Sequence, residues 1–181
     1  MPLYKTAEYD VLIKEDSFEI RKYKNFITAK VKEDDLKGSR GFNLLFNYIG
    51  GSNDEGKKIA MTTPVINELT NDGITTEFVL PFNKLDSKFP EPNDERITFK
   101  EYVNESFASI KFSGSINEEL IQEKMKLLFE WIKEKGYISK GNVILARYNP
   151  PFIPGIFKRN EILIPVEVEV LKWLIKLLTI F

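Results

Sequence analysis

FEIRKYKNFITAKV, at residues 18–31, returns later in the chain as ITFKEYVNESFASIKF, at residues 97–112. The first copy predicts a strand over 18–31 with a turn or bulge at Lys24-Asn25, and the second copy predicts strands at 97–102 and 107–112. Tyr23 of the first copy matches Tyr102 of the second, and a leucine-rich segment follows each copy at a similar distance. We therefore predict two β-α-β-β units of about 80 residues, each with an apolar sheet face that the other covers.

The segments around these two stretches complete an α+β domain. Apolar residues at helical spacing predict a helix over 40–49, and the glycine pair that follows would end it. Ser115 and Glu118 have the spacing of a capping box and predict a second helix that ends at Gly136. Further strands are predicted at residues 9–13, 59–68, 75–80, 143–148 and 161–166. The expected architecture is a curved or barrel-like antiparallel sheet with two helices.

Composition excludes several classes of function. The 181 residues include 26 Lys and Arg against 27 Asp and Glu, so the chain lacks the basic surplus of a protein that binds nucleic acid through phosphates. It contains no Cys, which excludes disulfides, thiol nucleophiles and iron–sulfur clusters. It contains no His, which excludes a Ser-His-Asp triad, a histidine-ligated metal and a haem held by a proximal histidine.

Two local motifs resemble binding sites but fail on detail. Residues 51–57, GSNDEGK, match half of a P-loop, yet Lys58 stands where a Ser or Thr would coordinate magnesium. The segment also follows a helix and precedes a strand, the reverse of the order that directs amides at a phosphate. The acidic pairs at 34–35 and 54–55 lack the spacing of a calcium loop. No metal site is predicted.

The helix over 40–49 differs from an ordinary surface helix. Four residues at positions i, i+3, i+4 and i+7 are expected to face the core: Phe42, Leu45, Phe46 and Ile49. Leu44 and Tyr48 are expected on the opposite side, with Arg40 one turn before Leu44. This outward stripe could bind a flat amphipathic ligand, with Arg40 on a carboxylate, or it could be scattered surface apolar residues that bind nothing.

The two ends of the chain predict location and domain limits. The opening MPLYKTAEYD lacks the apolar region of a secretory signal, so a cytoplasmic location is expected. The domain is expected to span 1–166, followed by an apolar tail at 167–181. Residues 171–181, LKWLIKLLTIF, predict an amphipathic helix of about 17 Å, too short for the ~30 Å core of a bilayer. The tail could pack on its own domain, contact a second chain or lie on a membrane surface.

Several strings stand in an order that resembles the SOUL haem-binding protein family: RGFNLLFNYIGGSN (40–53), KIAMTTPV (58–65), FPEPNDERI (89–97), ARYNPP (146–151) and RNE (159–161). KIAMTTPV after the helix is the most specific of them, and the resemblance spans roughly residues 7–166. It implies a distorted β-barrel flanked by two helices, and binding of haem or another tetrapyrrole. It also implies no settled catalytic activity, so the chain is expected not to be an enzyme.

The resemblance implies a ligand site as well, an apolar cleft beside the first helix with basic residues near the haem propionates. Carried onto this chain, it selects helix, loop and second-half residues: Arg40, Leu44, Tyr48, Lys57, Lys58, Phe152, Ile153, Phe157 and Lys158. Some members appear to use an axial histidine, which this chain lacks. Haem would then bind non-covalently through apolar contacts and propionate pairing, or with Tyr48 or Met61 as an axial ligand.

Three functions remain open from the sequence. The leading one is a non-enzymatic carrier or buffer for haem or a related tetrapyrrole. The second is a module that binds a protein or a membrane surface, or self-associates, through the outward stripe and the tail at 171–181. The third is a small-molecule sensor or a hydrolase on a similar two-repeat barrel, where an enzyme without His or Cys would depend on carboxylates, Tyr or Lys.

Overall fold

The computed structural model describes residues 5–33, 39–81, 88–150 and 152–168. Its elements are, in chain order, β1 (Lys5–Thr6), β2 (Tyr9–Glu15), β3 (Phe18–Tyr23), β4 (Phe26–Glu33), α1 (Ser39–Ile49), β5 (Thr62–Thr63), β6 (Val65–Thr70), β7 (Gly73–Val79), β8 (Thr98–Tyr102), β9 (Ser106–Phe112), α2 (Glu118–Glu134), β10 (Ile138–Ser139), β11 (Ile144–Arg147), the 3-10 turn η1 (Gly155–Phe157) and β12 (Asn160–Glu167). The tail helix predicted at 171–181 lies outside the described residues.

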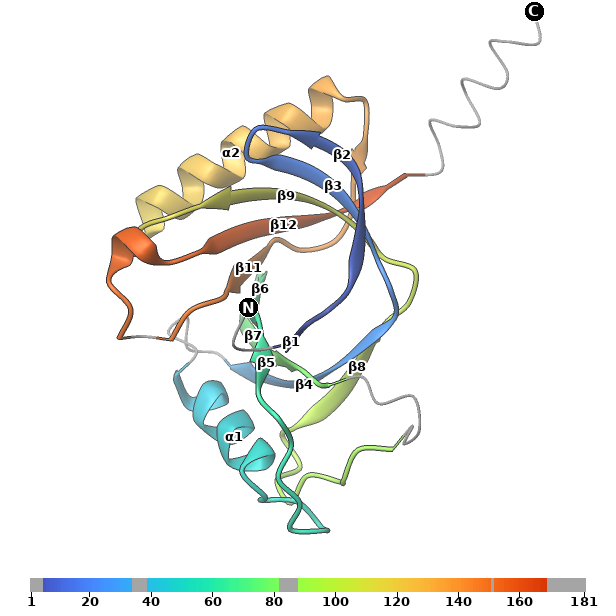
Figure 1. The fold of residues 1–181 in the computed structure, drawn as a ribbon, viewed down its shortest axis with the longest axis vertical. Helices are drawn as coiled ribbons and strands as arrows, with labels where there is room; N and C mark the ends of the chain where they lie inside the picture. Colours follow the sequence, from blue (N-terminus) through green and yellow to red (C-terminus); the bar gives the residue numbers. More distant parts are fainter. Residues whose placement is uncertain (1–4, 34–38, 82–87, 151, 169–181) are drawn as a thin grey trace, which may run out of the picture.

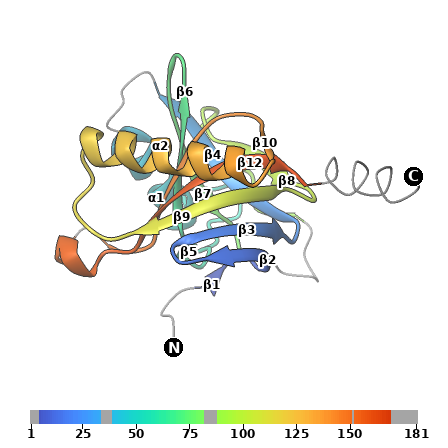
Figure 2. The same cartoon turned by 90° about the horizontal axis from the view of Figure 1, so that it is seen from above.

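Ten strands form one antiparallel sheet with the path β2-β3-β9-β12-β11-β6-β7-β4-β8, and β10 pairs with β12. The sheet curls, with α2 over the half that contains β9 and β12 and α1 over the half that contains β4 and β7 (Figures 1 and 2). The predicted α+β fold with a curved antiparallel sheet and two helices is confirmed. Within the described part of the chain, the edge strands β2 and β8 do not pair with each other, so the sheet is an open half-barrel.

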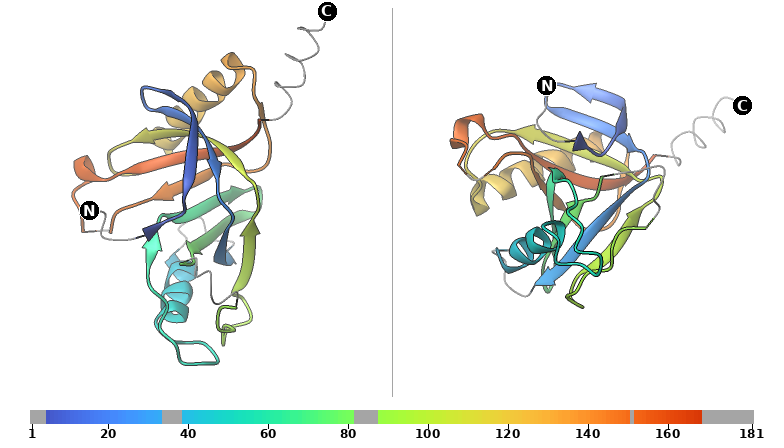
Figure 3. Two further views of the ribbon diagram at one scale, coloured as in Figure 1. Left: turned by 45° about the vertical axis from the view of Figure 1, so that its right-hand side comes forward. Right: turned by 60° about the horizontal axis from the view of Figure 1, so that its bottom comes forward.

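The order of elements differs from the predicted unit. Two strands, β3 and β4, precede α1, and β6 and β7 follow it; β8 and β9 precede α2, and β11 and β12 follow it. The predicted β-α-β-β unit was therefore one strand short, because the polar break inside each matched stretch separates two strands of the sheet. The duplication itself stays a prediction. Outside this sheet, β1 pairs in parallel with β5 and links edge strand β2 to the α1 half (Figure 3).

Alternation along the strands gives the sheet a convex face under the helices and a concave face between its two halves. On β11, Leu145 joins the core under α2, whereas Ile144 and Ala146 join the core of the concave face. A third core lies between α1 and strands β4 and β7, and it includes Val31 and Phe78. Each helix is thus held by burial of its apolar side on the convex face.

Helix α2 begins two residues later than the capping box predicted. Asn117 is its N-cap, and its Oδ1 accepts a hydrogen bond of 2.8 Å from the Leu120 backbone N–H. The predicted use of Ser115 as the cap is wrong, because Asn117, two residues closer to the apolar stripe, satisfies the free N–H of Leu120. The predicted end at Gly136 is confirmed, since Gly136 adopts φ 72° directly after the helix, a conformation that favours glycine.

The strand predicted at 59–68 begins later and is broken. Only Thr62–Thr63 and Val65–Thr70 are extended and paired, as β5 and β6. Pro64 stands between them and carries no N–H for a ladder hydrogen bond, so one strand cannot continue through it. Upstream, the Ile59 N–H donates to the Ile49 carbonyl and ties this segment to the end of α1.

Two polar clusters on the concave face join distant strands. Arg21 of β3 donates to Glu161 of β12 at 2.6 and 3.1 Å, and Tyr148 donates to the same carboxylate at 2.9 Å. In the other cluster, Glu77 of β7 accepts from Tyr102 of β8 at 3.1 Å. Burial opposes ionisation of Glu161, but hydrogen bonds and the charge of Arg21 outweigh it and lower the pKa of that carboxyl. The first cluster is therefore a buried, fully bonded ion pair.

Candidate ligand-binding site on the convex face

Helix α1 buries a different set of side chains from the predicted one. Tyr48, expected to project outward, is fully buried, and its hydroxyl donates to the Pro90 carbonyl at 2.9 Å. Burial raises the pKa of Tyr48 to about 12. Phe46, expected in the core, is 52% exposed. The predicted outward stripe is therefore wrong at Tyr48, and the exposed aromatic side chain of the helix is Phe46.

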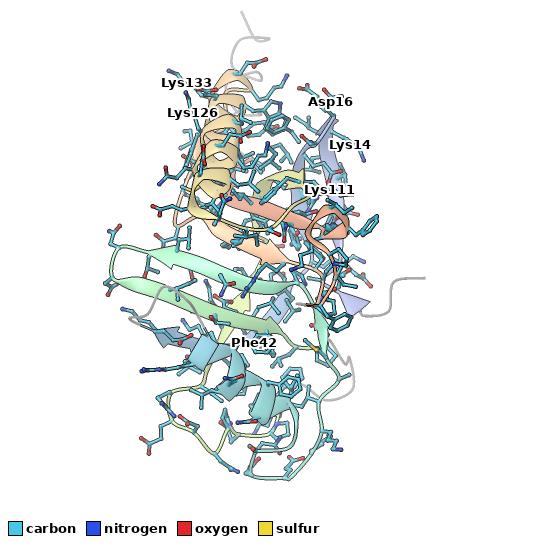
Figure 4. The ribbon with its side chains drawn as sticks, turned by 90° about the vertical axis from the view of Figure 1, so that its left-hand side faces the viewer. Lys14, Asp16, Phe42, Lys111, Lys126 and Lys133 are labelled. Atoms are coloured by element: carbon cyan, nitrogen blue, oxygen red, sulfur yellow. The ribbon has the colours of Figure 1, made fainter. Side chains whose placement is uncertain are left out.

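The reason is that α1 is covered along one flank by a part of the chain far away in sequence. The Tyr48 ring packs edge-on against Phe99 of β8, with the ring centroids 6.1 Å apart. On the other flank, Phe42 contacts Phe78 of β7 at 5.2 Å, and Phe46 stacks beyond Phe42 at 6.1 Å. In the sheet, β7 lies on the β6 side of β4 and β8 lies on the far side. Phe42 therefore occupies the flank of α1 nearer to β6 (Figure 4), and Phe46 stacks on Phe42 along that flank.

The predicted basic residues lie at opposite ends of α1. Arg40 is exposed in the first turn, while Lys57 and Lys58 are exposed in the loop that follows the helix. Ten helical residues span about 15 Å, so these two groups do not converge on one point. Leu44 is half-buried against the core of α1.

The predicted second-half residues form an exposed apolar turn that is firmly attached. Phe152 and Phe157 are 81% and 71% exposed, whereas Ile153 and Lys158 are half-buried. Ile156, which the sequence did not predict, is 75% exposed on the same turn. The Gly114 N–H donates to the Gly155 carbonyl at 3.0 Å. A Cβ on Gly155 would come within 2.5 Å of Ser115 Oγ, so the turn lies directly against the segment before α2. Such exposure on a fixed turn is typical of a contact surface.

Met61, the predicted sulfur ligand, is half-buried and packs in the core between α1 and the sheet. Its thioether is a soft donor atom, as is that of Met125, which packs in the core under α2. The described residues hold no cluster of three or more acidic groups that could bind a metal ion. The described residues of the site therefore offer chiefly an apolar surface.

A row of residues on the convex face connects α1 with the apolar turn. In register across β7, β6, β11 and β12 it runs Phe78, Val65, Arg147 and Asn160. Phe42 packs on Phe78 at one end, and at the other end the Asn160 amide donates to the Gly114 carbonyl at 3.0 Å, beside η1. Three strand spacings make this row about 14 Å long. We call it the convex row.

Arg147 is the residue of the convex row that the sequence analysis missed. It lies in the segment ARYNPP (146–151), but the sequence of a short strand does not show which side chains an arginine contacts. Its Nε is buried and has no hydrogen-bond partner. Burial lowers the pKa of Arg147. An arginine nevertheless stays charged at neutral pH.

A cavity lies on the concave face. It measures about 310 Å³ including its open mouth, and its lining is almost wholly apolar: Ala7, Tyr23, Phe26, Pro64, Ile66, Val79, Tyr102, Phe107, Ile144 and Leu163. Its aromatic rings are packed against one another, with Phe26 and Tyr102 stacked at 4.5 Å. The cavity is narrow because these rings fill most of the space between the two halves of the sheet.

Comparison with known families matches residues 4–165 to the family described as SOUL heme-binding protein. A curated relative, Heme-binding protein 2 of Mus musculus, is 25% identical over 164 residues, which cover 84% of this chain and 79% of that protein. The match extends from β1 to β12 and includes both helices.

Similar solved structures extend the comparison of the fold. The EcmrR C-terminal domain superposes with a TM-score of 0.59 at 14% identity, covering 88% of this chain and 98% of that domain. A hydrolase from Listeria innocua superposes with a TM-score of 0.58 at 11% identity, covering 86% of this chain and 94% of that one. At such low identity these likenesses establish the architecture alone. In the described part of the chain, neither helix has the length and apolar character needed to cross a bilayer.

Proposed function

Because the chain belongs to the SOUL haem-binding protein family, we propose that it binds haem or a related tetrapyrrole as a non-enzymatic carrier. The observation that carries this proposal is the exposed apolar surface at the two ends of the convex row. Phe46 lies at the α1 end, and Phe152, Ile156 and Phe157 lie at the η1 end. A flat macrocycle that spans such a row buries apolar area on both sides of itself.

The residues of this surface fit the porphyrin ring and the propionates of haem better than they fit its iron. Aromatic side chains can contact the ring face, and cationic side chains near the row can receive propionates. Tyr48 is removed from the candidate axial ligands, because its hydroxyl is buried and already bonded to Pro90. Met61 remains as a weak sulfur ligand. Since the chain has no His or Cys, binding is expected to depend little on iron ligation.

Each part of the surface has a separate task in this proposal. Phe46 and Phe157 bind the ring and exclude water from one face of it. Ile153, half-buried beneath the turn, sets how far the turn projects. Lys158, at the end of η1, and Arg40, at the start of α1, provide positive charge at the edges of the surface, and Lys57 and Lys58 add charge farther along. Haem itself would supply the redox-active iron, and the protein would hold it without catalysing a reaction.

Exchange of Phe46 and Phe157 for serine is expected to weaken haem binding by at least about tenfold, because each buried phenyl group contributes about 1.5–3 kcal/mol. The measurement is a haemin titration followed at the Soret band. Phe129→Ser on α2, where the phenylalanine is 40% exposed, is the matched control and should bind as the wild type does. Equal affinity in the double variant and the wild type would contradict this location of the site.

The concave cavity supports a second candidate function, the binding of a small apolar molecule. Its apolar lining and its open mouth favour this function, and its present volume would admit only a ligand much smaller than haem unless the rings move. A saturable haemin shift that is unaffected in the Phe46→Ser/Phe157→Ser variant would favour the cavity. The carboxylates Glu77 and Glu161 nearby are bonded to other strands, which favours a structural role over catalysis.

A further inference from the structure

Arg147 occupies the middle of the convex row. On β11, Leu145 belongs to the core of the convex face, so Arg147, two residues later, projects on the same side. Its neighbours in register are Val65 on β6 and Asn160 on β12. The guanidinium therefore lies between the flank of α1 that carries Phe46 and the turn that carries Phe157.

No acidic side chain of the described residues pairs with Arg147. Glu161 lies in register with Ala146, the residue before Arg147, and it is held by Arg21 on the concave face. Glu68 and Glu77 accept from Lys100 on that same face. Glu33 projects on the convex face, but from β4, which is separated from β11 by β7 and β6. The Arg147 Nε, sealed from water, has no hydrogen bond at all.

An arrangement of this kind is unusual in a folded protein. Buried guanidinium groups are ordinarily paired with a carboxylate or bonded to carbonyl oxygens, because an unpaired buried charge is costly. Arg21, the fully buried arginine of the sheet, follows that rule with two bonds to Glu161, whereas Arg147 is half-buried and only its Nε is sealed from water. Arg147 differs in that its surroundings are apolar on the α1 side and its two terminal nitrogens remain available to a ligand.

We propose that Arg147 is the anion receptor of the convex site and binds a carboxylate of the ligand, which for a tetrapyrrole is a propionate. The inference rests on the proposed function and names the cation that the family resemblance had placed at Arg40. A planar guanidinium binds a carboxylate with two parallel hydrogen bonds. Its place in the row puts that anion at the centre of the surface, with apolar contacts to the ring on either side.

Two metal-free ligands separate propionate pairing from iron ligation: protoporphyrin IX and its dimethyl ester, which lacks the negative charges. Both are titrated against the wild type, Arg147→Met, Arg147→Lys and Arg40→Met, with the absorbance of the porphyrin as the signal. We expect Arg147→Met to bind the free acid at least about tenfold more weakly and the ester within twofold of the wild type. Arg147→Lys should retain part of the affinity for the acid, and Arg40→Met, at the edge of the surface, should lose less of that affinity than Arg147→Met.

Thermal melting without ligand provides a second readout. Arg147→Met should melt no lower than the wild type, because the arginine has no partner whose loss would destabilise the fold. A clearly lower melting temperature would overturn the inference, since it would reveal a structural contact. If the wild type binds both porphyrins but Arg147→Met binds the acid equally well, the inference fails and the proposed function stands. If the wild type binds neither porphyrin, both fail together.

Discussion

Replacement of Arg21 by methionine is expected to lower the free energy of unfolding by about 3–5 kcal/mol. Arg21 is 2% exposed, and its two hydrogen bonds hold Glu161, which is fully buried on another strand of the sheet. Removal of the guanidinium leaves a buried carboxylate with only Arg159 and Tyr148 as partners. Urea unfolding of the variant and the wild type at neutral pH measures the difference.

The loss should depend on pH in a defined direction. Arg21 lowers the pKa of Glu161 below its ordinary value of 4.5, so the pair stabilises the native state above that pH and loses this contribution as the pH falls. In Arg21→Met, Glu161 keeps only Arg159 as a charged partner, so burial is offset less and the pKa of this carboxyl is higher than in the wild type. The carboxyl of the variant therefore takes up a proton at a higher pH than that of the wild type, and the difference in the free energy of unfolding should narrow on acidification.

Lys24→Met is the matched control for this experiment. Lys24 pairs with Glu8 at 2.6 Å on the surface, where the two side chains are 65% and 72% exposed. Exposed pairs of this kind contribute little to stability because water screens them. The control should unfold at the same urea concentration as the wild type. A loss in Lys24→Met equal to that in Arg21→Met would show that charge removal as such, and not burial, causes the effect.

The elements of this fold were predictable because their signals are local. Two matched stretches, the alternation of the strands and the glycine after α2 each follow from a few neighbouring residues. A curved or barrel-like antiparallel sheet with two helices was expected on those grounds, and the open half-barrel is what the structure adds. The strand break at Pro64 was also a local signal, since proline cannot donate a ladder hydrogen bond, and the prediction of an unbroken strand at 59–68 overlooked it.

The sides of helix α1 were not predictable in the same way. Its periodicity correctly placed Leu45 and Ile49 in the core. It could not decide between Phe46 and Tyr48, because which flank is covered depends on β8 and on the segment around Pro90, far away in sequence. Arg147 was missed for the same reason. It stands out because its buried Nε has no hydrogen-bond partner, and which side chains surround an arginine depends on the tertiary fold.

The residues of the candidate site also fall into two groups, those that the sequence identified and those that only the tertiary fold identifies. Phe152, Ile153, Phe157 and Lys158 were named from a family resemblance, and the structure describes them on one exposed, anchored turn. Their role as ligand contacts stays a proposal. Arg40 came from the same resemblance, yet it occurs on the flank of Leu44 by helical spacing, away from Phe42 and Phe46. The convex row supplies a cation on the other flank, where the exposed aromatic rings are.

Replacement of Tyr48 by alanine is expected to destabilise the protein by about 3–5 kcal/mol, the usual cost of deleting a buried aromatic side chain. Tyr48 is fully buried, and it links α1 to β8 through Phe99 and to the preceding segment through Pro90. Tyr48→Phe keeps the ring and loses only the hydrogen bond, so its cost should be about 1–3 kcal/mol. Urea unfolding of both variants measures these values.

The same pair of variants decides whether Tyr48 takes part in ligand binding. In Tyr48→Phe the fold is retained, so a haemin titration of this variant reports on the hydroxyl alone. Because that hydroxyl donates to the Pro90 carbonyl inside the protein, we expect the affinity of Tyr48→Phe to equal that of the wild type. A loss of tenfold or more in Tyr48→Phe would show that the hydroxyl reaches the ligand and would contradict its buried position. A loss in Tyr48→Ala alone would instead follow from detachment of α1, since the convex row then loses the helix that carries Phe46.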